Sequence, residues 1–361
     1  MKFDDKVLAE RCADAEREAI LADPGFGLHF TDHMAHARWT PDKGWHDDAI
    51  VPHAPLTLSP AAAVLHYAQE VFEGLKAYRR ADGSVWLFRP EKNGERFQRS
   101  AQRLGLPELD VDDFIASIEA LIRADAAWVP TPHDGGEESL YIRPFMFASE
   151  PFLGVRAAHE VDYYVIGSPA GAYFASGVAP VSIWITKTYS RAGAGGTGAA
   201  KCGGNYASSL IAQQEAAENG CSQVLFADAG SKQHAEELGG MNVFFLDADD
   251  RLVTPPLSDS ILHGVTRSSV LQVAADLGME TVERPIVLDE VLQEIRDGRI
   301  REAFACGTAA VITPIGVFKS DAGEFHVGDD AGECTLQLRN HLLDIQYGRA
   351  EDTHGWTRQV C

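Results

Sequence analysis

The sequence predicts a two-domain α+β protein, and three observations support this fold class. The chain has 361 residues, which is too long for one ordinary compact core. Runs typical of strands and of helices occur in both halves, so each half can form a sheet backed by helices. The loop GAYFASGVAP separates the halves, and we place an N-terminal domain at 1–175, a linker at 176–185 and a larger C-terminal domain at 186–361.

Four helices and a sheet are predicted for the N-terminal half. The first helix covers 6–21, and the second opens at Ser59-Pro60 and carries AAAVLHYAQEVF, since serine caps helices and proline suits their first turn. Two more are predicted over 91–105 and 110–128. The runs GLKAYRR and SVWLFRP flank an Asp-Gly turn, which is typical of a hairpin. SLYIRPFMFAS and EVDYYVIGSPA are rich in β-forming residues and complete the sheet.

The C-terminal half alternates between strand-like and helical patterns. Strands are predicted at VSIWIT, QVLFAD, MNVFFLD, RLVT, EAFACGT and AVITPIGVF. Helices are predicted at NYASSLIAQQEAAENG, TRSSVLQVAADLG, VLDEVLQEIRDG and CTLQLRNHLLDIQYG, several with a glycine at the end. The DADDR segment lacks the spacing of a calcium-binding loop and is interpreted as a hairpin turn.

Composition excludes some classes of partner. Against 31 Lys and Arg residues stand 53 Asp and Glu residues, a formal net charge of −22. This charge repels nucleic acids and anionic membranes, so neither is a predicted partner. The six cysteines show no C-x-x-C pair and no disulfide or zinc spacing, which indicates a reducing compartment. A charged N-terminal segment argues against a signal peptide, no apolar run reaches about 18 residues, and we expect a cytoplasmic protein.

The most unusual segment is RAGAGGTGAAKCGGN, in which six glycines surround Lys201. It contains a G-x-G-x-x-G pattern, but a dinucleotide-binding fingerprint requires a helix that Gly203-Gly204 would break. A P-loop is also excluded, because Cys202 rather than Ser or Thr follows the lysine. A lysine that forms a Schiff base must lose its proton, which desolvation in a tight Gly-rich turn would favour. From the spacing alone, Lys201 could equally be a Schiff-base lysine or a solvated lysine in a loop.

Ordered motifs along nearly the whole chain resemble the branched-chain aminotransferases of pyridoxal-phosphate (PLP) fold type IV. The motifs are FTDHM, LHYAQEVFEGLKAYR, NGERFQRSAQRLG, YIRPFMFASEPFLGV, GSPAGAYF, GGTGAAKCGGNYASSL, AEELGGMNVFF, TPPLSDSILHGVTR, FACGTAA and DIQYGR. The resemblance implies the D-amino-acid-aminotransferase-like fold, with pyridoxal 5′-phosphate at the domain interface and held mainly by the C-terminal domain. It also implies ping-pong transfer of the amino group of L-leucine, L-isoleucine or L-valine to 2-oxoglutarate, without a metal.

The same resemblance assigns the cofactor site. Lys201 is implied to bond to the cofactor and to move the proton between substrate and cofactor. Glu237, rather than its neighbour Glu236, is implied to contact the ring nitrogen, where an electron sink requires a carboxylate, and Tyr206 is implied to donate to the phenolic oxygen. The residues implied to hold the phosphate are Arg96, Val265, Thr266 and Thr308.

The implied substrate pocket has apolar walls and one cation. Its walls are Phe30, Phe72, Tyr141, Tyr173, Ala309 and Ala310. Arg143 is implied to bind the side-chain carboxylate of glutamate or 2-oxoglutarate. Tyr67, Leu153 and Val155 are implied to come from the partner subunit, so we expect a homodimer. Gly240 stands where the family has a threonine, which leaves fine specificity open.

Three other functions stay open at this stage. A D-amino-acid aminotransferase or an aminodeoxychorismate lyase shares the lysine and the glutamate, although the Tyr-Ile-Arg-Pro and Phe-Glu-Gly-Leu-Lys segments favour the branched-chain enzyme. A nicotinamide-dependent oxidoreductase predicts no covalent chromophore. A non-catalytic acidic binding module is a further alternative, but it does not explain why Lys201, Tyr206 and Glu237 occur together. The stretch GTAAVITP lacks the C-x-x-C redox pair of some relatives, so thiol regulation of that kind is not expected.

Overall fold

The computed structural model describes residues 1–4, 11–133, 136–171 and 178–361, which form two compact units. The first unit comprises Met1–Ala175, Ala200–Gly203 and Ile345–Cys361. The second comprises Ser176–Ala199 and Gly204–Asp344. The predicted domain boundaries at 175 and 186 therefore do not include two later segments that belong to the first unit, Ala200–Gly203 and Ile345–Cys361. Within the segment 176–185 predicted as a linker, residues from Val181 onward belong to a strand.

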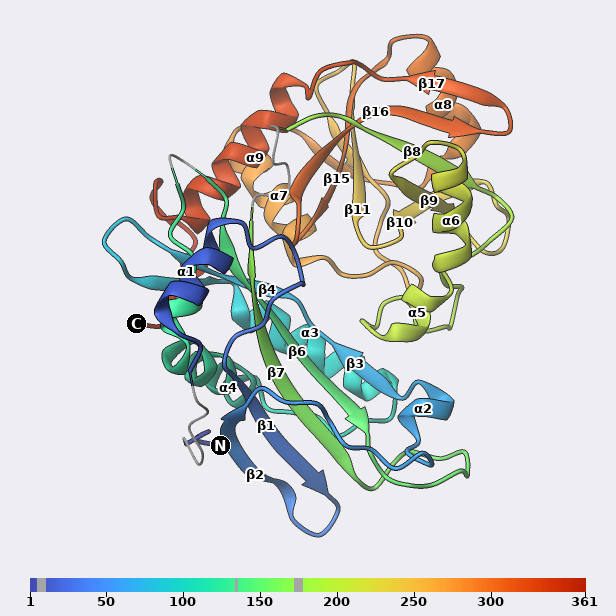
Figure 1. Cartoon of the computed structure of the whole chain (residues 1–361). Coiled ribbons are helices and arrows are strands. Elements are labelled where there is room, and N and C mark those ends of the chain that lie inside the picture. The colour runs from blue at the N-terminus through green and yellow to red at the C-terminus, as the bar shows by residue number, and fades with distance from the viewer. Residues whose placement is uncertain (5–10, 134–135, 172–177) are drawn as a thin grey trace. The chain divides into compact units, whose positions relative to one another are not determined.

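The first unit is built on an antiparallel sheet (Figure 1). Its strands are β1 (His33–Thr40), β2 (Gly44–Pro52), β3 (Glu70–Phe72), β4 (Leu75–Arg79), β5 (Val85–Phe88), β6 (Ser139–Ala148), β7 (Val161–Ala170) and β18 (Thr357–Gln359). Their order is β18-β5-β4-β6-β7-β1-β2, and β3 pairs with β6. The predicted β4–β5 hairpin, β6 and β7 are confirmed. The strands β1 and β2 were not predicted, because their alanine, histidine and aspartate residues give a weak β pattern.

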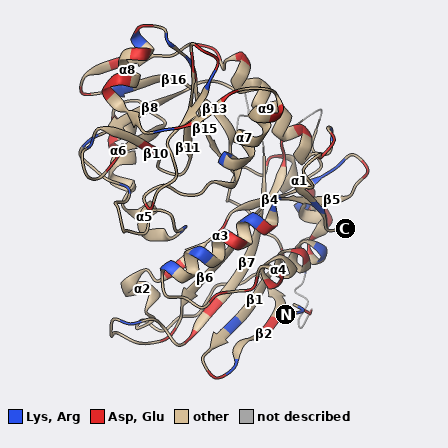
Figure 2. Cartoon of the chain, turned by 180° about the vertical axis from the view of Figure 1, so that it is seen from behind, with Lys and Arg blue, Asp and Glu red and all other residues tan. Residues whose placement is uncertain are grey.

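The helices of this unit are α1 (Asp14–Ala22), α2 (Val64–Tyr67), α3 (Pro90–Arg103) and α4 (Val111–Ala124), followed by a 3-10 turn, η1 (Ala126–Trp128). The N-cap of α4 is Asp110, whose side chain accepts from the amide of Asp112. Residues of α3 and α4, among them Phe97 and Phe114, join the strands in one buried core. Acidic residues of α3 lie in its first part, and basic residues continue toward its end (Figure 2). The helices predicted over 91–105 and 110–128 are thus confirmed.

The helix predicted from Ser59-Pro60 onward is wrong in extent. Only Val64–Tyr67 is helical, and Ala68 adopts a left-handed conformation (φ 48°) that ends it. The next residues form β3, whose three positions pair with Met146 and its neighbours in β6. Long-range strand pairing therefore overrides the local helix propensity of AAAVLHYAQEVF. Of the helix predicted over 6–21, residues 6–10 lie outside the described residues, and α1 forms the later part.

The second unit contains a mixed sheet. Its strands are β8 (Val181–Thr186), β9 (Gln223–Ala227), β10 (His234–Leu238), β11 (Asn242–Asp247), β12 (Leu252–Thr254), β13 (Thr281–Glu283), β14 (Ile286–Val287), β15 (Ile300–Gly307), β16 (Val311–Ser320) and β17 (Gly323–His326). The order is β13-β12-β11-β15-β16-β8-β9-β10-β14, with β17 on β16. The β16–β8, β8–β9 and β12–β13 pairs are parallel. All six predicted strands are present, and the DADDR segment forms the β11–β12 turn.

The helices of the second unit are α5 (Gly203–Ala207), α6 (Leu210–Glu218), α7 (Val265–Asp276), α8 (Leu288–Arg296) and α9 (Glu333–Gln346). The four predicted helical segments are confirmed, except that the first is split into α5 and α6. Buried residues of α8, such as Leu288 and Ile295, share a core with the sheet. Among the described residues, no helix combines the length and apolar character that a membrane span requires.

Candidate active site

The segment that carries Lys201 is held by backbone contacts within the first unit. The amide of Lys201 donates to Ser100 Oγ on α3 (2.9 Å), and its carbonyl accepts from the amide of Phe72 on β3 (3.0 Å). The amide of Gly203 donates to the Glu70 carboxylate. These contacts fix the backbone on both sides of the lysine, so its side chain starts from a defined point.

Packing strengthens this attachment. Ala200 and Cys202, on either side of the lysine, are 3% and 2% exposed and belong to the core of the first unit. A Cβ on Gly203 would lie 2.3 Å from Glu70 Oε1, so a larger residue there would displace the Glu70 carboxylate. Earlier in the segment, a Cβ on Gly198 would lie 2.4 Å from Ser260 Cα. The glycines around Lys201 therefore permit close packing against the protein itself.

Lys201 has an aromatic and cationic neighbourhood in the first unit. Its Nζ lies 4.9 Å from the centroid of the Phe72 ring, and the Arg143 guanidinium carbon lies 4.8 Å from the same centroid. Arg143 Nη2 donates to the Tyr141 hydroxyl (3.2 Å). That hydroxyl packs on Gly74, where a Cβ would lie only 2.1 Å away. The structure thus brings together Phe72, Tyr141, Arg143 and Lys201.

The alternation of β6 explains this arrangement. Tyr141 and Arg143 are half-buried on one face of the strand, while Leu140 and Ile142 are fully buried on the other. Phe26 packs edge-on against Tyr141 with centroids 5.0 Å apart and was not predicted. Among the described wall residues, Phe72 on β3 and Tyr141 on β6 are linked through Arg143.

Other substrate residues predicted in the first unit are placed differently. Phe30 stacks on His53, with ring centroids 5.1 Å apart. The Tyr67 hydroxyl donates to the carbonyl of Leu153, and both side chains are exposed together with Val155, which is 87% exposed. Tyr67 and the 153–155 loop therefore form one group on the surface of this unit. Tyr173 lies outside the described residues.

Arg96 is the predicted phosphate ligand on α3, and it is 4% exposed. Its guanidinium makes a two-point ion pair with Glu73, with Nε–Oε1 at 2.7 Å and Nη2–Oε2 at 2.8 Å. Burial alone would raise the pKa of the Glu73 carboxyl, but the Arg96 charge and its hydrogen bonds hold that pKa below its usual range. Glu73 was not predicted, although a carboxylate in the otherwise apolar run VFEGL was a usable signal.

In the second unit, Glu237 on β10 is 3% exposed and forms a buried ion pair with Arg191. Its carboxylate also accepts from the amide of Leu262 (2.9 Å) and from Asn242 Nδ2 (3.3 Å). Arg191 Nη2 additionally donates to the carbonyls of Gly198 and Ser260, both at 2.9 Å. Arg191 opens the Gly-rich segment and was missed, because an arginine at a loop start is usually a surface residue.

The neighbouring carboxylate behaves differently. Glu236 contacts the hydroxyl of Ser260, and burial raises its pKa above the ordinary value. These two adjacent acidic residues of β10 therefore have different surroundings: Glu237 pairs with the buried Arg191, whereas Glu236 contacts a serine hydroxyl. This agrees with the assignment of Glu236 to a structural role.

The remaining predicted residues of the second unit lie at loop and helix ends. Val265 and Thr266 begin α7, where, among the described residues, no side chain caps the first turn after Gly264. A Cβ on Gly240 would lie 3.9 Å from the Tyr206 ring, so these two positions are neighbours. The predicted residues that follow β15 form its turn into β16 and are Thr308, Ala309 and Ala310.

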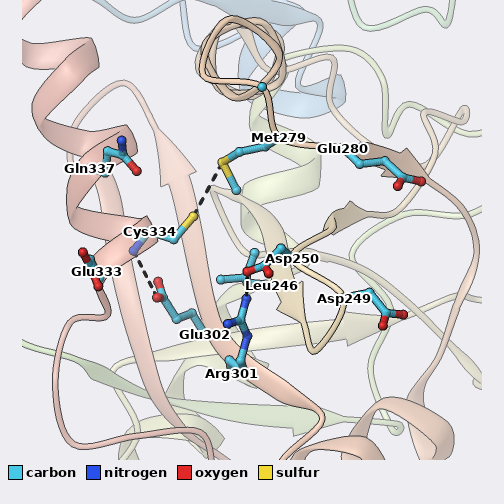
Figure 3. Close-up of a pocket in the computed structure, with 11 residues that line it drawn as sticks. Leu246, Asp249, Asp250, Met279, Glu280, Arg301, Glu302, Glu333, Cys334 and Gln337 are labelled. Carbon is cyan, nitrogen blue, oxygen red and sulfur yellow. Dashed lines mark hydrogen bonds and ion pairs between the residues drawn. The ribbon is translucent and has the colours of Figure 1, made fainter.

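A separate cavity of about 520 Å³ in the second unit lies near the β11–β12 turn and the start of α9 (Figure 3). The described residues that line it include none of the predicted site residues. Some of its polar groups are paired with one another: Glu302 accepts from the amide of Cys334 (3.0 Å), and Arg301 pairs with Asp250. The predicted chemistry therefore does not involve this cavity.

Comparison with known proteins shows which family the chain resembles. A family model described as amino-transferase class IV matches residues 70–317. The probable branched-chain-amino-acid aminotransferase of Streptomyces coelicolor is 57% identical over 99% of this chain and 98% of its own. The branched-chain-amino-acid aminotransferase of Mycobacterium tuberculosis H37Rv is 54% identical over 96% of this chain and 95% of its own.

Solved structures agree as well. The branched-chain amino acid aminotransferase of Escherichia coli superposes with a TM-score of 0.71 at 28% identity, over 90% of this chain and 99% of its own. That of Thermobaculum terrenum, solved in its PLP-form, gives a TM-score of 0.70 at 26% identity, over 90% and 98%. Fold, site and matches together define an aminotransferase. More narrowly, the chain belongs to the class IV aminotransferase family, which confirms the predicted family, fold class and cofactor, pyridoxal 5′-phosphate.

Proposed function

We propose that this aminotransferase transfers the amino group of L-leucine, L-isoleucine or L-valine to 2-oxoglutarate, giving the branched-chain 2-oxo acid and L-glutamate. The observation that carries the proposal is the grouping of Lys201, Phe72, Tyr141 and Arg143. An apolar ring beside the lysine suits a branched side chain, and a guanidinium against that ring suits a carboxylate. The 57% identity to a probable branched-chain-amino-acid aminotransferase supports the same substrate class.

The donor groups fit pyridoxal 5′-phosphate. A buried arginine and the uncapped start of α7 offer a cation and amide donors for the phosphate. A buried carboxylate, Glu237, offers a counter-charge for the ring nitrogen, and Lys201 offers the amine. We propose that these groups, with Tyr206 and Thr308, hold the cofactor, which when bound would supply an electron sink for the substrate Cα.

The chain's own residues have separate tasks in the proposed reaction. Lys201 Nζ holds and moves the proton at the substrate Cα, and the backbone contacts to Ser100 and Phe72 limit where that amine can reach. Glu237 keeps a negative charge at the ring nitrogen, with Arg191 balancing its burial. Arg143 and Tyr141 orient the side chain of the dicarboxylic substrate.

Two substrates then share one pocket in turn, which is the physical basis of a ping-pong cycle. The branched-chain 2-oxo acid would depart from the pocket before 2-oxoglutarate enters it. Phe72 contacts either side chain, while Arg143 acts only on the carboxylate of glutamate or 2-oxoglutarate. Gly240 beside Tyr206 leaves space that a threonine would occupy.

A homodimer is part of the proposal. Tyr67, Leu153 and Val155 form an exposed group on the first unit. Apolar side chains grouped on a surface are typical of a site that another protein covers. We propose that they complete the substrate pocket of a partner subunit. Sedimentation velocity of the wild type and of Val155→Asp tests this: the variant should shift toward monomer and lose activity together, and a fully active monomer would contradict it.

The visible absorption spectrum tests the catalytic proposal. The holoenzyme should show a cofactor band that bleaches with L-leucine and returns with 2-oxoglutarate. Bleaching by D-leucine but not by L-leucine would instead indicate a D-amino-acid aminotransferase. A protein that stays colourless after addition of pyridoxal 5′-phosphate would contradict the proposal and favour a nucleotide-binding function.

A further inference from the structure

Glu73 lies directly after β3 and is 0% exposed. Its Oε1 accepts from Arg96 Nε (2.7 Å), and its Oε2 accepts from Arg96 Nη2 (2.8 Å). Oε2 also accepts from Asn93 Nδ2 (2.7 Å) and from the amide of Gly74 (3.1 Å). Both oxygens of a fully buried carboxylate are therefore committed to donors, and Arg96 contributes to each oxygen.

We propose that Glu73 is a positioning residue that holds the Arg96 guanidinium in the orientation in which it binds the cofactor phosphate. The inference rests on the proposed function, in which Arg96 is a phosphate ligand. A guanidinium is planar, so a two-point contact along one edge also sets the plane and direction of the opposite edge. Asn93 and Gly74 hold the carboxylate in turn, so the orientation is set by β3 and α3 together.

The chemistry of the pair requires a carboxylate rather than an amide. A carboxylate accepts on both oxygens, whereas glutamine accepts on one and donates from the other. If Glu73→Gln places its oxygen toward Asn93 and Arg96 Nη2, its amide nitrogen faces the Arg96 Nε–H, and two donors oppose each other. The reverse orientation puts the amide nitrogen against Asn93 and Arg96 Nη2. Either way, Arg96 must turn away from its present direction.

A purely electrostatic role for Glu73 predicts the opposite sign. Removal of its negative charge would leave Arg96 with more net positive charge, which attracts a phosphate more strongly. A positioning role predicts weaker phosphate binding, because the guanidinium no longer points in one direction. The sign of the change in phosphate-dependent affinity therefore separates the two roles.

The experiment compares pyridoxal 5′-phosphate with pyridoxal, which lacks the phosphate. Cofactor-free wild-type protein and Glu73→Gln are titrated with each compound, and the ratio of the two dissociation constants measures the contribution of the phosphate alone. We expect the preference for the phosphorylated compound to fall roughly tenfold in the variant, as for a disturbed hydrogen bond to a charged group. A loss of stability without a role in positioning would weaken both compounds equally and leave the ratio unchanged.

The matched control is Glu119→Gln. Glu119 is a buried carboxylate of the same unit that accepts from Arg123 Nη2 and Arg358 Nε, each at 2.7 Å. Its variant should lower the melting temperature but keep the wild-type ratio. A second test combines Glu73→Gln with Arg96→Gln: since Glu73 acts through Arg96, the double variant should show no further loss of preference beyond Arg96→Gln alone.

The outcomes are distinguishable. Wild-type protein that binds neither compound would contradict the proposed function and this inference together. Wild-type protein that prefers the phosphorylated compound, with an unchanged or increased preference in Glu73→Gln, would overturn the inference alone. If Glu73→Gln does not fold, Asn93→Ala removes one donor to Oε2, and the preference should fall two- to threefold, roughly as for a single neutral hydrogen bond. An unchanged preference in that variant would also overturn the inference.

Discussion

Each unit contains an arginine–glutamate pair in which both side chains are buried, Arg96–Glu73 in the first and Arg191–Glu237 in the second, and these two pairs have opposite proposed roles. In the first unit, the arginine, Arg96, is the proposed cofactor ligand, and Glu73 supports it. In the second unit, the carboxylate, Glu237, is the proposed ligand, and Arg191 supports it. A buried ion is costly unless an opposite charge and hydrogen bonds accompany it. A buried charged side chain can therefore bind a ligand when a second charge of opposite sign is buried beside it.

The largest effect is expected at Lys201, the reacting group that both pairs are proposed to serve. Lys201→Ala should reduce kcat by about four orders of magnitude, because it removes both the covalent attachment and the group that moves the proton. Steady-state assays with L-leucine, together with gel filtration, provide the measurement. The variant should elute like the wild type, and ordinary turnover by it would contradict the mechanism.

The ligand of the second pair comes next. Glu237→Gln should fold but lower kcat by roughly 10²- to 10³-fold, since a neutral amide cannot balance charge at the ring nitrogen. Glu236→Gln is the matched control on the same strand, and it should keep most of the activity. Equal rates for Glu237→Gln and the wild type would remove Glu237 from this role.

Arg143 sharpens the comparison, because its guanidinium forms no ion pair with a carboxylate in the part of the first unit that the structure describes. Arg143→Ala should raise the KM for 2-oxoglutarate about 30-fold, as for loss of a charge-assisted hydrogen bond, and change that for L-leucine little. Both KM values should be measured. A uniform increase for the two substrates would contradict the assignment of Arg143 to the carboxylate.

The support of the second pair should have a smaller effect. Arg191→Lys keeps the charge beside Glu237 but loses the fork that also reaches the carbonyls of Gly198 and Ser260, so kcat should fall about tenfold. Arg251→Lys, in the part-buried pair with Asp247 in the β11–β12 turn, is the control and should match the wild type. Unchanged kcat in Arg191→Lys would show that charge alone is sufficient.

The smallest effect concerns pH and stability. The folded-state pKa of Glu73 is lowered, so its ion pair stabilises the fold above the unfolded pKa of about 4.3, and this contribution is lost as pH falls through the folded value. The melting temperature of the wild type should therefore exceed that of Glu73→Gln at pH 6 by more than at pH 4. Burial raises the pKa of Glu70, so the difference between wild type and Glu70→Gln should change in the opposite direction. If the melting-temperature difference from the wild type changed with pH in the same direction for both variants, the opposite pKa shifts of Glu73 and Glu70 would be contradicted.

Much of the fold follows from local sequence patterns, but several elements do not. The amphipathic pattern and the Asp110 cap predict α4, and the Asp-Gly turn predicts the β4–β5 hairpin. By contrast, β3 lies in a run of good helix formers, and only pairing with β6 makes it a strand. The short strands β13, β14 and β17 escaped prediction for the same reason, since their two to four residues carry too little pattern of their own.

The site divides in the same way. Motifs around Lys201, Glu237 and Arg143 could be recognised from the sequence, because their unusual residue types lie in short, distinctive segments. Their supports, Glu73 and Arg191, were not recognised. The apolar run around Glu73 was a usable signal, but the partner of each support lies more than twenty positions away along the chain, and no local pattern specifies it. The assigned roles of the site residues themselves stay predictions that the variants above test.

The sequence by itself determined the family, the fold class and the cofactor, because these depend on ordered motifs that can be read locally. Only the tertiary structure decided that residues 200–203 pack in the first unit, although the residues before and after them belong to the second. The reason is physical: the amide and carbonyl of Lys201 find their partners on α3 and β3, and the side chains beside it are buried in that core. Such partners lie about a hundred residues away, and no local pattern specifies them.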